Sequence, residues 1–235
     1  MKLLKFLLLL IASTNVNAYT LSPSSSAKWG SPTLGTGATI SYSYMLGGEA
    51  CDIGSCSSLD SFMPTDYKTE IGKAFDAWSS VTNLNFFEVT DDGADAGSIT
   101  SSGDIRIGGE NMDGQHGVLA HAYYPHTSSW GGDLHFDLNE TWSIDGLAGT
   151  ISIFWVALHE IGHSLGLGHS DDSNSIMGPY YNPHLTTLGA DDIAGIQHLY
   201  GTPVLSAVPI PAALWLLAPA LIGLFGFRKT NLNSI

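Results

Sequence analysis

The chain has 235 residues, which is enough for one domain of ordinary size with a buried core. Its formal net charge is −14, and all 22 acidic residues lie between Glu49 and Asp192. Because a surface of this sign repels phosphate groups, we expect the protein not to bind nucleic acid.

Residues 1–18 have the pattern of a secretory signal peptide. Two lysines precede an apolar run from Phe6 to Ala12, and the compact residues Val16 to Ala18 suit cleavage before Tyr19. The alternative is a membrane anchor, but a bilayer core takes about 20 residues to cross and this run is far shorter. We therefore exclude this segment from the fold and expect a protein that leaves the cytosol.

Two segments precede the first cysteine. Residues 19–37 are rich in Ser, Pro, Gly and Thr, which predicts an extended segment rather than a packed element. Residues 38–45 alternate in polarity and predict a strand with Ile40, Tyr42 and Tyr44 on one face.

The two cysteines, Cys51 and Cys56, lie in a stretch rich in Gly and Ser. In a protein that leaves the cytosol this pair predicts a local disulfide. A metal site built on the pair is the alternative, and it is disfavoured because no histidine or further cysteine lies nearby in the sequence.

Residues 66–81 have the periodicity of an amphipathic helix, whose aromatic face is best explained by packing on the core. Residues 85–89 and 104–107 are predicted strands. The stretch from Gly108 to Glu140 is dominated by Gly, His, Asp and aromatic residues, a composition typical of loops that are functional or stiffened by metal ions.

Two further helices are predicted, over residues 151–165 and 190–200. The second begins at an Asp pair, which suits the positive end of a helix, and stops at Gly201.

The stretch from His159 to His169 reads HEIGHSLGLGH and contains the residues suited to chemistry. His159 and His163 are four residues apart on the predicted helix, so they share a face and can bind one metal ion. Gly166 permits a left-handed turn that brings His169 back as a third ligand. Three protein ligands leave the fourth position of a zinc ion open.

Glu160 lies beside the first ligand but is not needed as one. Its carboxylate is available to take a proton from zinc-bound water, whose pKa the metal lowers from about 16 to about 7, and to pass that proton to the leaving amine of a peptide bond. A chance cluster of histidines is the alternative. The fixed spacing of Gly166 and His169, with Met177 downstream, disfavours it.

The same stretch resembles the metzincin motif HExxHxxGxxH, and Ser175-Ile176-Met177 resembles its Met-turn. Within the metzincins the matrixins, the catalytic domains of matrix metalloproteinases, are the most similar, through residues 67–89, 118–142 and 188–201. The resemblance covers most of residues 38–201. It implies an α+β, zincin-like fold: a twisted, mixed but mostly parallel sheet with an active-site helix, a Met-turn and a C-terminal helix.

The resemblance also assigns roles around the catalytic zinc. Met177 is expected to form a hydrophobic floor beneath the metal. Pro179 and Tyr181 match residues that line the main specificity pocket, which implies an apolar side chain after the cleaved bond. The substrate is expected to lie along an edge strand above the zinc.

Matrixins also hold a structural zinc, with ligands from a His-x-Asp pair in a loop and from two later histidines. His121 and His135 match the later two. The corresponding loop, residues 108–116, is short and lacks the His-x-Asp pair, so we expect this site to be partly lost. Two alternatives remain: the two are ordinary strand histidines, or His116 or a nearby carboxylate completes the site.

The resemblance further implies two calcium sites. Asp113, Asp137 and Glu140 match carboxylates of one, and Asp104 and Asp133 match those of the other. Ligation by oxygen suits calcium better than zinc. The alternative is that these acids are solvated loop residues.

Residues 202–211 read as a linker, and residues 212–229 as an apolar membrane or sorting segment that ends in Arg228 and Lys229. A buried core helix is the alternative. Val208-Pro209-Ile210-Pro211 with this apolar run resembles a bacterial C-terminal sorting signal of the PEP-CTERM type. Such signals carry Glu where this chain has Ile210, so a simple membrane anchor is the other interpretation.

The sequence thus predicts a bacterial zinc endopeptidase, secreted or anchored at the cell surface, which hydrolyses extracellular or surface proteins. We expect one catalytic zinc, structural calcium, a protein or peptide substrate, and a monomer whose tail meets the membrane or a sorting machinery. The alternative is a cell-surface adhesion or envelope-structural protein. Such a protein would not need an open zinc position with an adjacent base.

Overall fold

The computed structural model describes residues 19–23, 28–98, 101–125 and 130–204. The predicted signal peptide and the predicted sorting segment lie outside the described residues. The chain divides into two compact units, residues 1–203 and 204–235, and only the first is described beyond a single residue. Within the described ranges, no helix has the length and apolar character that a bilayer span requires.

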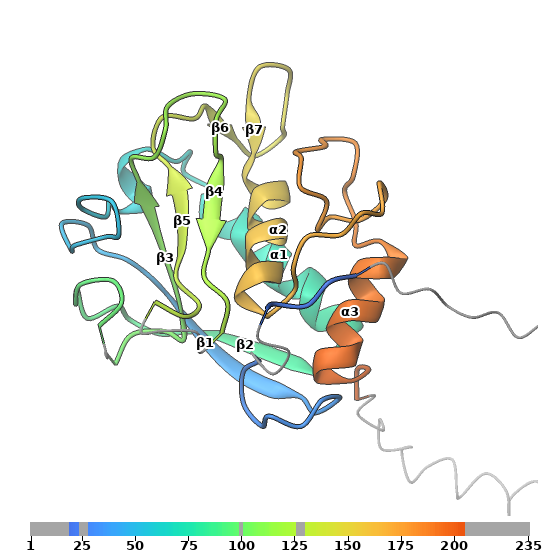
Figure 1. Ribbon diagram of the computed structural model, residues 1–235. Helices are drawn as coiled ribbons and strands as arrows, with labels where there is room; N and C mark the ends of the chain where they lie inside the picture. Colours follow the sequence, from blue (N-terminus) through green and yellow to red (C-terminus); the bar gives the residue numbers. More distant parts are fainter. Residues whose placement is uncertain (1–18, 24–27, 99–100, 126–129, 205–235) are drawn as a thin grey trace, which may run out of the picture. The chain divides into compact units, whose positions relative to one another are not determined.

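Five strands form one sheet: β1 (Ala38–Tyr44), β2 (Leu84–Glu88), β3 (Ile105–Glu110), β4 (Ala120–Ala122) and β5 (Leu134–Asp137). Their order is β2-β1-β3-β5-β4, and every neighbouring pair is parallel except β4 with β5. Figure 1 shows β4 at the side of the sheet that faces α2. The mixed, mostly parallel sheet that the sequence predicted is therefore confirmed. A second, two-stranded sheet pairs β6 (Trp142–Ser143) with β7 (Ile151–Ser152).

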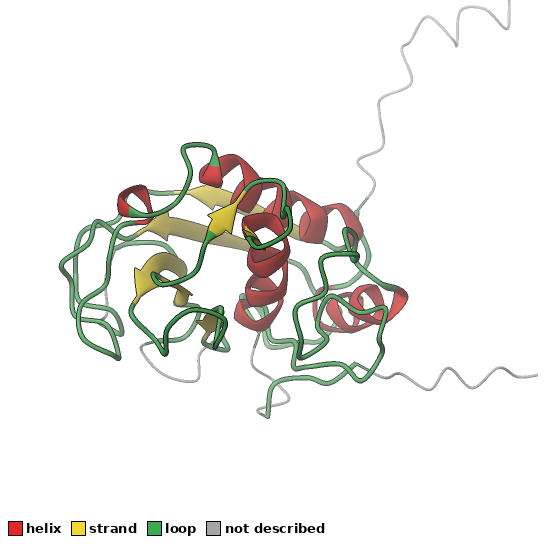
Figure 2. Ribbon diagram, turned by 90° about the horizontal axis from the view of Figure 1, so that it is seen from above, coloured by secondary structure: helices red, strands yellow, loops and turns green. Residues whose placement is uncertain are grey.

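Three α-helices accompany the sheet, α1 (Tyr67–Val81), α2 (Ile153–Ser164) and α3 (Ala190–Tyr200), together with a short 3-10 helix, Leu59–Ser61. The first two lie side by side in both views (Figures 1 and 2), and the indole N–H of Trp78 on α1 donates to the carbonyl of Leu158 on α2 at 3.0 Å. The active-site helix begins two residues later than predicted. The reason is that Ile151 and Ser152 pair with β6, and the Ser152 hydroxyl then caps the helix by accepting the Trp155 N–H.

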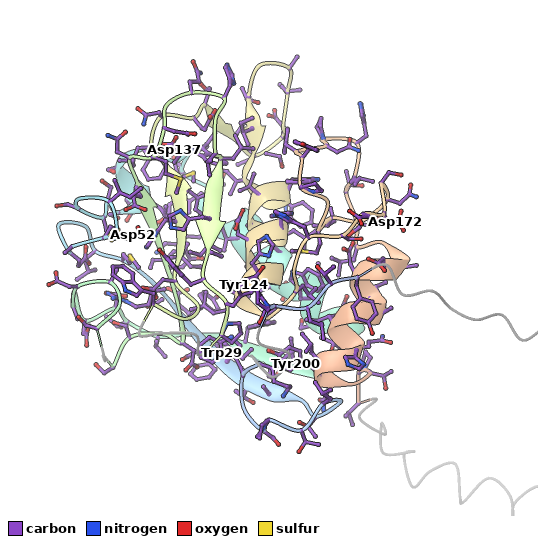
Figure 3. The ribbon with its side chains drawn as sticks, in the orientation of Figure 1. Trp29, Asp52, Tyr124, Asp137, Asp172 and Tyr200 are labelled. Atoms are coloured by element: carbon purple, nitrogen blue, oxygen red, sulfur yellow. A yellow bond between two sulfur atoms is a disulfide. The ribbon has the colours of Figure 1, made fainter. Side chains whose placement is uncertain are left out.

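The segment before β1 is more firmly packed than its composition predicted. Trp29 is buried, and its indole N–H donates to the carbonyl of Ser164 at 2.7 Å. The hydroxyl of Tyr200 donates to the carbonyl of Leu165 at 2.9 Å (Figure 3). Both bonds satisfy carbonyl groups that the end of α2 leaves without helical partners. The segment thus fixes the point where the chain leaves the active-site helix.

Candidate metal centre

Three histidines meet at the C-terminal half of α2. His159 and His163 lie one turn apart on the helix, and their Nε2 atoms are 3.1 Å from each other. One ligand nitrogen from each of these two and one from His169 all lie within 4.8 Å of one another. The predicted zinc ligands are therefore brought together with nitrogen atoms that converge on one point, which is what a tetrahedral zinc ion requires.

Backbone carbonyl groups orient the two helical ligands. His159 donates its Nδ1–H to the carbonyl of Ile176, and His163 donates its Nδ1–H to the carbonyl of Leu167, each at 2.7 Å. These bonds leave both Nε2 lone pairs for a metal. Burial lowers the pKa of His159 to about 4 and that of His163 to about 3, so both rings are neutral at neutral pH, as metal ligands must be.

The third ligand depends on the turn after the helix. Gly166 has φ +105°, a left-handed conformation that side chains disfavour, and the chain reverses there as predicted. The N-terminal segment then holds the following loop: the carbonyl of Thr20 accepts the Gly168 N–H at 2.9 Å, and the Thr20 hydroxyl donates to the carbonyl of His169. No sequence pattern predicted this contact, because 149 residues separate its two partners.

Glu160 is placed next to the first ligand on the same helix. Its side chain is buried, its Oε2 atom has no hydrogen-bond partner among the described residues, and burial raises its pKa to about 8. An unpaired buried carboxyl group is costly unless a cation or a ligand faces it. A zinc ion on the adjacent histidines fits this group and would favour its charged form.

Met177 packs against α2, the helix that carries two of the histidines. It is buried, and its sulfur lies so close to Gly162 of α2 that a Cβ atom there would be 2.3 Å from it. The adjoining turn is fixed by Asp192, at the start of α3, which accepts hydrogen bonds from the backbone N–H groups of Ile176 and Met177 at 2.8 and 3.2 Å. From the sequence, Asp192 was expected only to suit the positive end of a helix, as one of an Asp pair.

A cavity of ≈ 690 Å³ opens over the three histidines and has the size of a ligand site. β4 lines one side, and the loop with the predicted pocket residues Pro179 and Tyr181 lines another. Trp155 forms part of the wall: its ring stacks on His159 at 5.5 Å and 11°. Trp155 was not predicted as a site residue, although its position four residues before the first ligand places both on one helix face.

Tyr124 is a second aromatic residue of the cavity that the sequence analysis did not single out. It follows β4, and its ring meets the ring of His163 edge-on at 5.7 Å (Figure 3). Burial and the charge of Glu160 raise the pKa of its phenol, so the hydroxyl is neutral at neutral pH.

The predicted calcium ligands differ in what they contact. Asp137 and Glu140 are buried, and each keeps one carboxylate oxygen, Oδ2 and Oε2 respectively, that has no hydrogen-bond partner among the described residues. Asp113 accepts the backbone N–H of Val118 at 2.9 Å. A free, buried carboxylate oxygen suits a cation such as calcium, but none of the three acids belongs to the groups of three or more ligand atoms within 4.8 Å that the described residues form.

The second predicted pair, Asp104 and Asp133, makes hydrogen bonds to two different neighbours. Asp104 accepts hydrogen bonds from the N–H and the hydroxyl of Ser41 at 2.8 and 2.7 Å. Asp133 is buried, accepts the Gly97 N–H at 3.3 Å, and has its pKa raised by burial to about 6. Neither residue belongs to the groups of three or more ligand atoms within 4.8 Å that the described residues form.

His121 on β4 and His135 on β5 face each other across the antiparallel pair, with His121 Nε2 3.0 Å from His135 Nδ1. His116 lies elsewhere: its Nδ1 is 3.9 Å from Glu140, so it does not complete a site with them. The side chains that join the pair are Glu110 and Asp52. One alternative from the sequence is that His116 or a nearby carboxylate completes the site; Glu110, within residues 108–116, is such a carboxylate, and Asp52 lies outside that loop.

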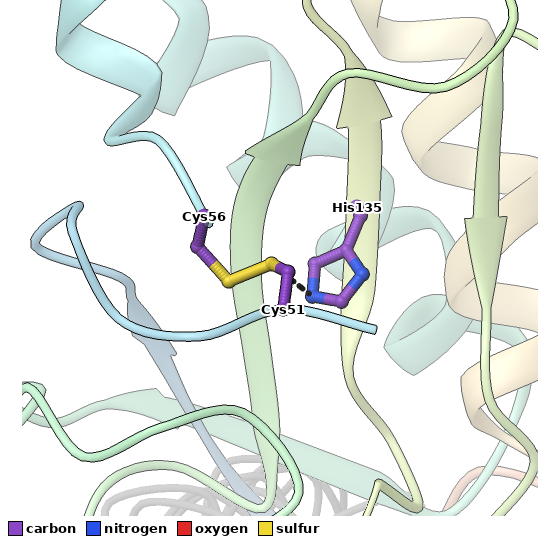
Figure 4. A group of neighbouring side chains, drawn as sticks. All are labelled: Cys51, Cys56 and His135. Atoms are coloured by element: carbon purple, nitrogen blue, oxygen red, sulfur yellow. Dashed lines mark hydrogen bonds between the residues drawn. A yellow bond between two sulfur atoms is a disulfide. The ribbon is translucent and has the colours of Figure 1, made fainter. Parts of the chain in front are cut away.

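Cys51 and Cys56 form a disulfide in the loop before the first helix (Figure 4). The same view shows the ring of His135 turned toward the sulfur of Cys51, with Nε2 at 3.7 Å from it.

Comparison with known proteins gives consistent matches to one family. A sequence model of the family described as Matrixin matches residues 55–201. The hatching enzyme of Paracentrotus lividus is 45% identical over 147 residues, which cover 58% of this chain and 23% of that protein. Macrophage metalloelastase of Oryctolagus cuniculus is 46% identical over 141 residues, or 59% of this chain and 30% of that one.

Matrix metalloproteinase-26 of Homo sapiens is 42% identical over 149 residues, which cover 62% of this chain and 56% of that protein. The matched part of this chain therefore spans less than two thirds of the length of each of these relatives.

Proposed function

The chain belongs to the matrixin family, and from this premise we propose that it is a zinc-dependent endopeptidase that cleaves extracellular or surface proteins. The observation that supports the proposal most strongly is the convergence of three histidine nitrogens beside the buried Glu160, at the base of a cavity lined by an edge strand. An adhesion or envelope-structural protein would have no use for a base without a partner next to an open metal position.

The mechanism follows from the placement of these groups. A zinc ion held by His159, His163 and His169 would polarise the carbonyl of the bond to be cleaved and make water more acidic. In its charged form, which a zinc ion would favour, Glu160 takes the proton from the attacking water and delivers it to the leaving amine. Trp155 and the carbonyl of Ile176 keep the ring of His159 in place during this transfer.

The substrate is proposed to bind as an added strand. β4 is the last strand of the sheet order, and its second edge has no strand partner within the described residues. Exposed backbone groups on such an edge bind an extended peptide by main-chain hydrogen bonds. Pro179 and Tyr181 then receive the side chain after the cleaved bond, and the Trp155 ring, which meets Tyr181 edge-on at 4.9 Å, makes that pocket apolar.

Calcium is part of the proposal at one site. Asp137 and Glu140 supply free, buried oxygens that would bind a calcium ion. Asp113, which accepts the Val118 N–H, is the third proposed ligand of this site. Asp104 and Asp133 are proposed for a second calcium site on the resemblance alone, since each is engaged with a different neighbour.

Secretion by residues 1–18 and attachment through residues 212–229 complete the proposal, including the bacterial sorting signal. They rest on the sequence pattern only. If the tail attaches the protein, the full chain sediments with membranes and a chain ending at Thr202 stays in solution. Equal solubility of both chains, with the tail intact in the first, refutes the attachment.

The function is tested by incubating the chain with casein or gelatin. We expect cleavage that a zinc chelator abolishes and that added zinc restores. A chain that binds zinc but cuts no protein or peptide in a broad panel would favour the structural alternative.

A further inference from the structure

Four side chains from four separate segments converge beside the disulfide. They are Asp52 in the disulfide loop, Glu110 at the end of β3, His121 on β4 and His135 on β5. Glu110 Oε2 lies 3.6 Å from His121 Nε2 and 3.4 Å from His135 Nδ1. The Asp52 carboxylate lies 3.8 Å from His121 and 3.9 Å from His135. Ligands of a tetrahedral zinc ion are separated by about 3.3 Å, so small movements would close this group around one ion.

The charges of this group call for a cation. The side chain of Glu110 is completely buried, and its Oε2 atom has no hydrogen-bond partner among the described residues. The Asp52 carboxylate is exposed and lies in the same group, and among the described residues both acids form their ion pairs with the two histidines. A buried carboxylate with a second carboxylate beside it is costly without a positive charge between them, and a divalent ion would supply it.

Contacts around the group orient each ligand. The Ile53 N–H donates to Oε1 of Glu110 at 2.5 Å, which turns Oε2 inward, and the Tyr123 hydroxyl donates to Asp52. His135 presents Nε2 to the Cys51 sulfur at 3.7 Å (Figure 4), so its Nδ1 lone pair is directed at the site. Partners of this kind fix the tautomer and direction of ligands in metal sites.

The disulfide loop reaches the sheet through backbone pairing. Ser57 and Gly109 exchange two hydrogen bonds of 2.8 Å, which places the loop against β3 immediately before Glu110. The disulfide then closes the chain around Asp52, the residue that follows Cys51. Two of the four ligands, Asp52 and His135, therefore depend on the position of Cys51.

The resemblance to matrixins implies a structural zinc at His121 and His135, and we propose that this chain keeps it with Asp52 and Glu110 in place of the missing His-x-Asp pair, and that the Cys51–Cys56 disulfide maintains this site. Two imidazoles with two carboxylates suit zinc, whereas calcium takes oxygen ligands. The ion would tie the disulfide loop to β4, the strand proposed to bind substrate. Its ligands are not those of the catalytic site, so a substitution at one site should remove the zinc bound there and leave the zinc at the other site in place.

The proposal is tested by elemental analysis of purified full chains. We expect two zinc ions per chain in the wild type, one in Glu110→Gln and one in Asp52→Asn. His163→Ala, which loses a catalytic ligand, should keep one. Ser55→Ala, in the same disulfide loop but without a ligand, is the matched control and should keep two.

The disulfide is tested by zinc release to a chromogenic chelator. In Cys51→Ala/Cys56→Ala we expect the second zinc to be released at least about tenfold faster than in the wild type, with the catalytic zinc unchanged. The catalytic zinc also reports that each variant is folded. One zinc in the wild type, or two in both carboxylate variants, overturns the site. Unchanged release from the cysteine variant overturns the role of the disulfide.

Discussion

Asp192 accepts the backbone N–H of Ile176 at 2.8 Å, and the carbonyl of the same Ile176 accepts the Nδ1–H of His159 at 2.7 Å. A carboxylate at the start of α3 therefore acts on a catalytic ligand through a single residue, Ile176. It also accepts the Met177 N–H, so the position of Met177 depends on it as well. Asp192 is a positioning residue that does not itself touch the metal site.

Replacement of Asp192 by Ala should loosen this arrangement. We expect the affinity of the histidine site for zinc to fall about 10- to 100-fold, as is typical when an outer partner of a metal ligand is removed. Competition with a chelator measures it. Asp145→Ala, which removes an exposed carboxylate from a loop, is the control and should leave the affinity unchanged. A variant of Asp192 with wild-type affinity would show that the turn is fixed by packing alone.

Two glycines in helices should respond oppositely to Ala. At Gly162 a Cβ atom would meet the Met177 sulfur at 2.3 Å, so we expect Gly162→Ala to destabilise the protein by about 1–3 kcal/mol in spite of the better helix propensity of Ala. At Gly72 on α1 a Cβ atom would meet nothing within 4 Å, and Gly72→Ala should stabilise by about 0.5–1 kcal/mol. Urea unfolding measures both. Equal changes in the free energy of unfolding for the two variants would contradict the close contact between Gly162 and the Met177 sulfur.

Asp91 and Arg106 form a buried ion pair, with NH2 to Oδ1 at 2.7 Å. Burial alone would raise the pKa of Asp91, but hydrogen bonds from Arg106 and its neighbours outweigh it and the pKa is lowered. A lowered carboxyl pKa contributes stability above the unfolded value of about 4, and that stability is lost as pH falls through the folded value.

We therefore expect Asp91→Asn to reduce the free energy of unfolding by about 3–5 kcal/mol at pH 7, because Arg106 stays buried without its charge partner. The difference between variant and wild type should shrink progressively below about pH 4. Denaturant unfolding of both chains across this range measures it. If the free energy of unfolding of the variant differed from that of the wild type by the same amount at every pH, the effect of the substitution would not come from the loss of the ion pair.

The sequence was sufficient to predict the arrangement of site residues that lie close together along the chain. His159, Glu160, His163 and the turn at Gly166 lie within eight residues, so helix periodicity and the freedom of glycine determine their arrangement. The mostly parallel sheet was predicted because the resemblance implies the direction of the strands, which periodicity does not.

Residues joined by tertiary structure could not be predicted in the same way. Asp52 is far from His121 and His135 in the sequence, and the disulfide loop brings it to the edge of β3, β5 and β4 where Glu110 and the two histidines lie. Thr20 reaches the loop of the third ligand across 149 residues for the same reason. Neither relationship leaves a periodic pattern in the chain.

The most direct test of the proposed function replaces Glu160 by Ala and measures peptide hydrolysis and zinc content together. We predict that kcat falls by about 10²- to 10⁴-fold, because the variant lacks the group that moves the proton, while the zinc content equals that of the wild type. His163→Ala should instead contain one zinc fewer and be inactive. A Glu160→Ala chain that hydrolyses peptides at close to the wild-type rate would contradict the mechanism.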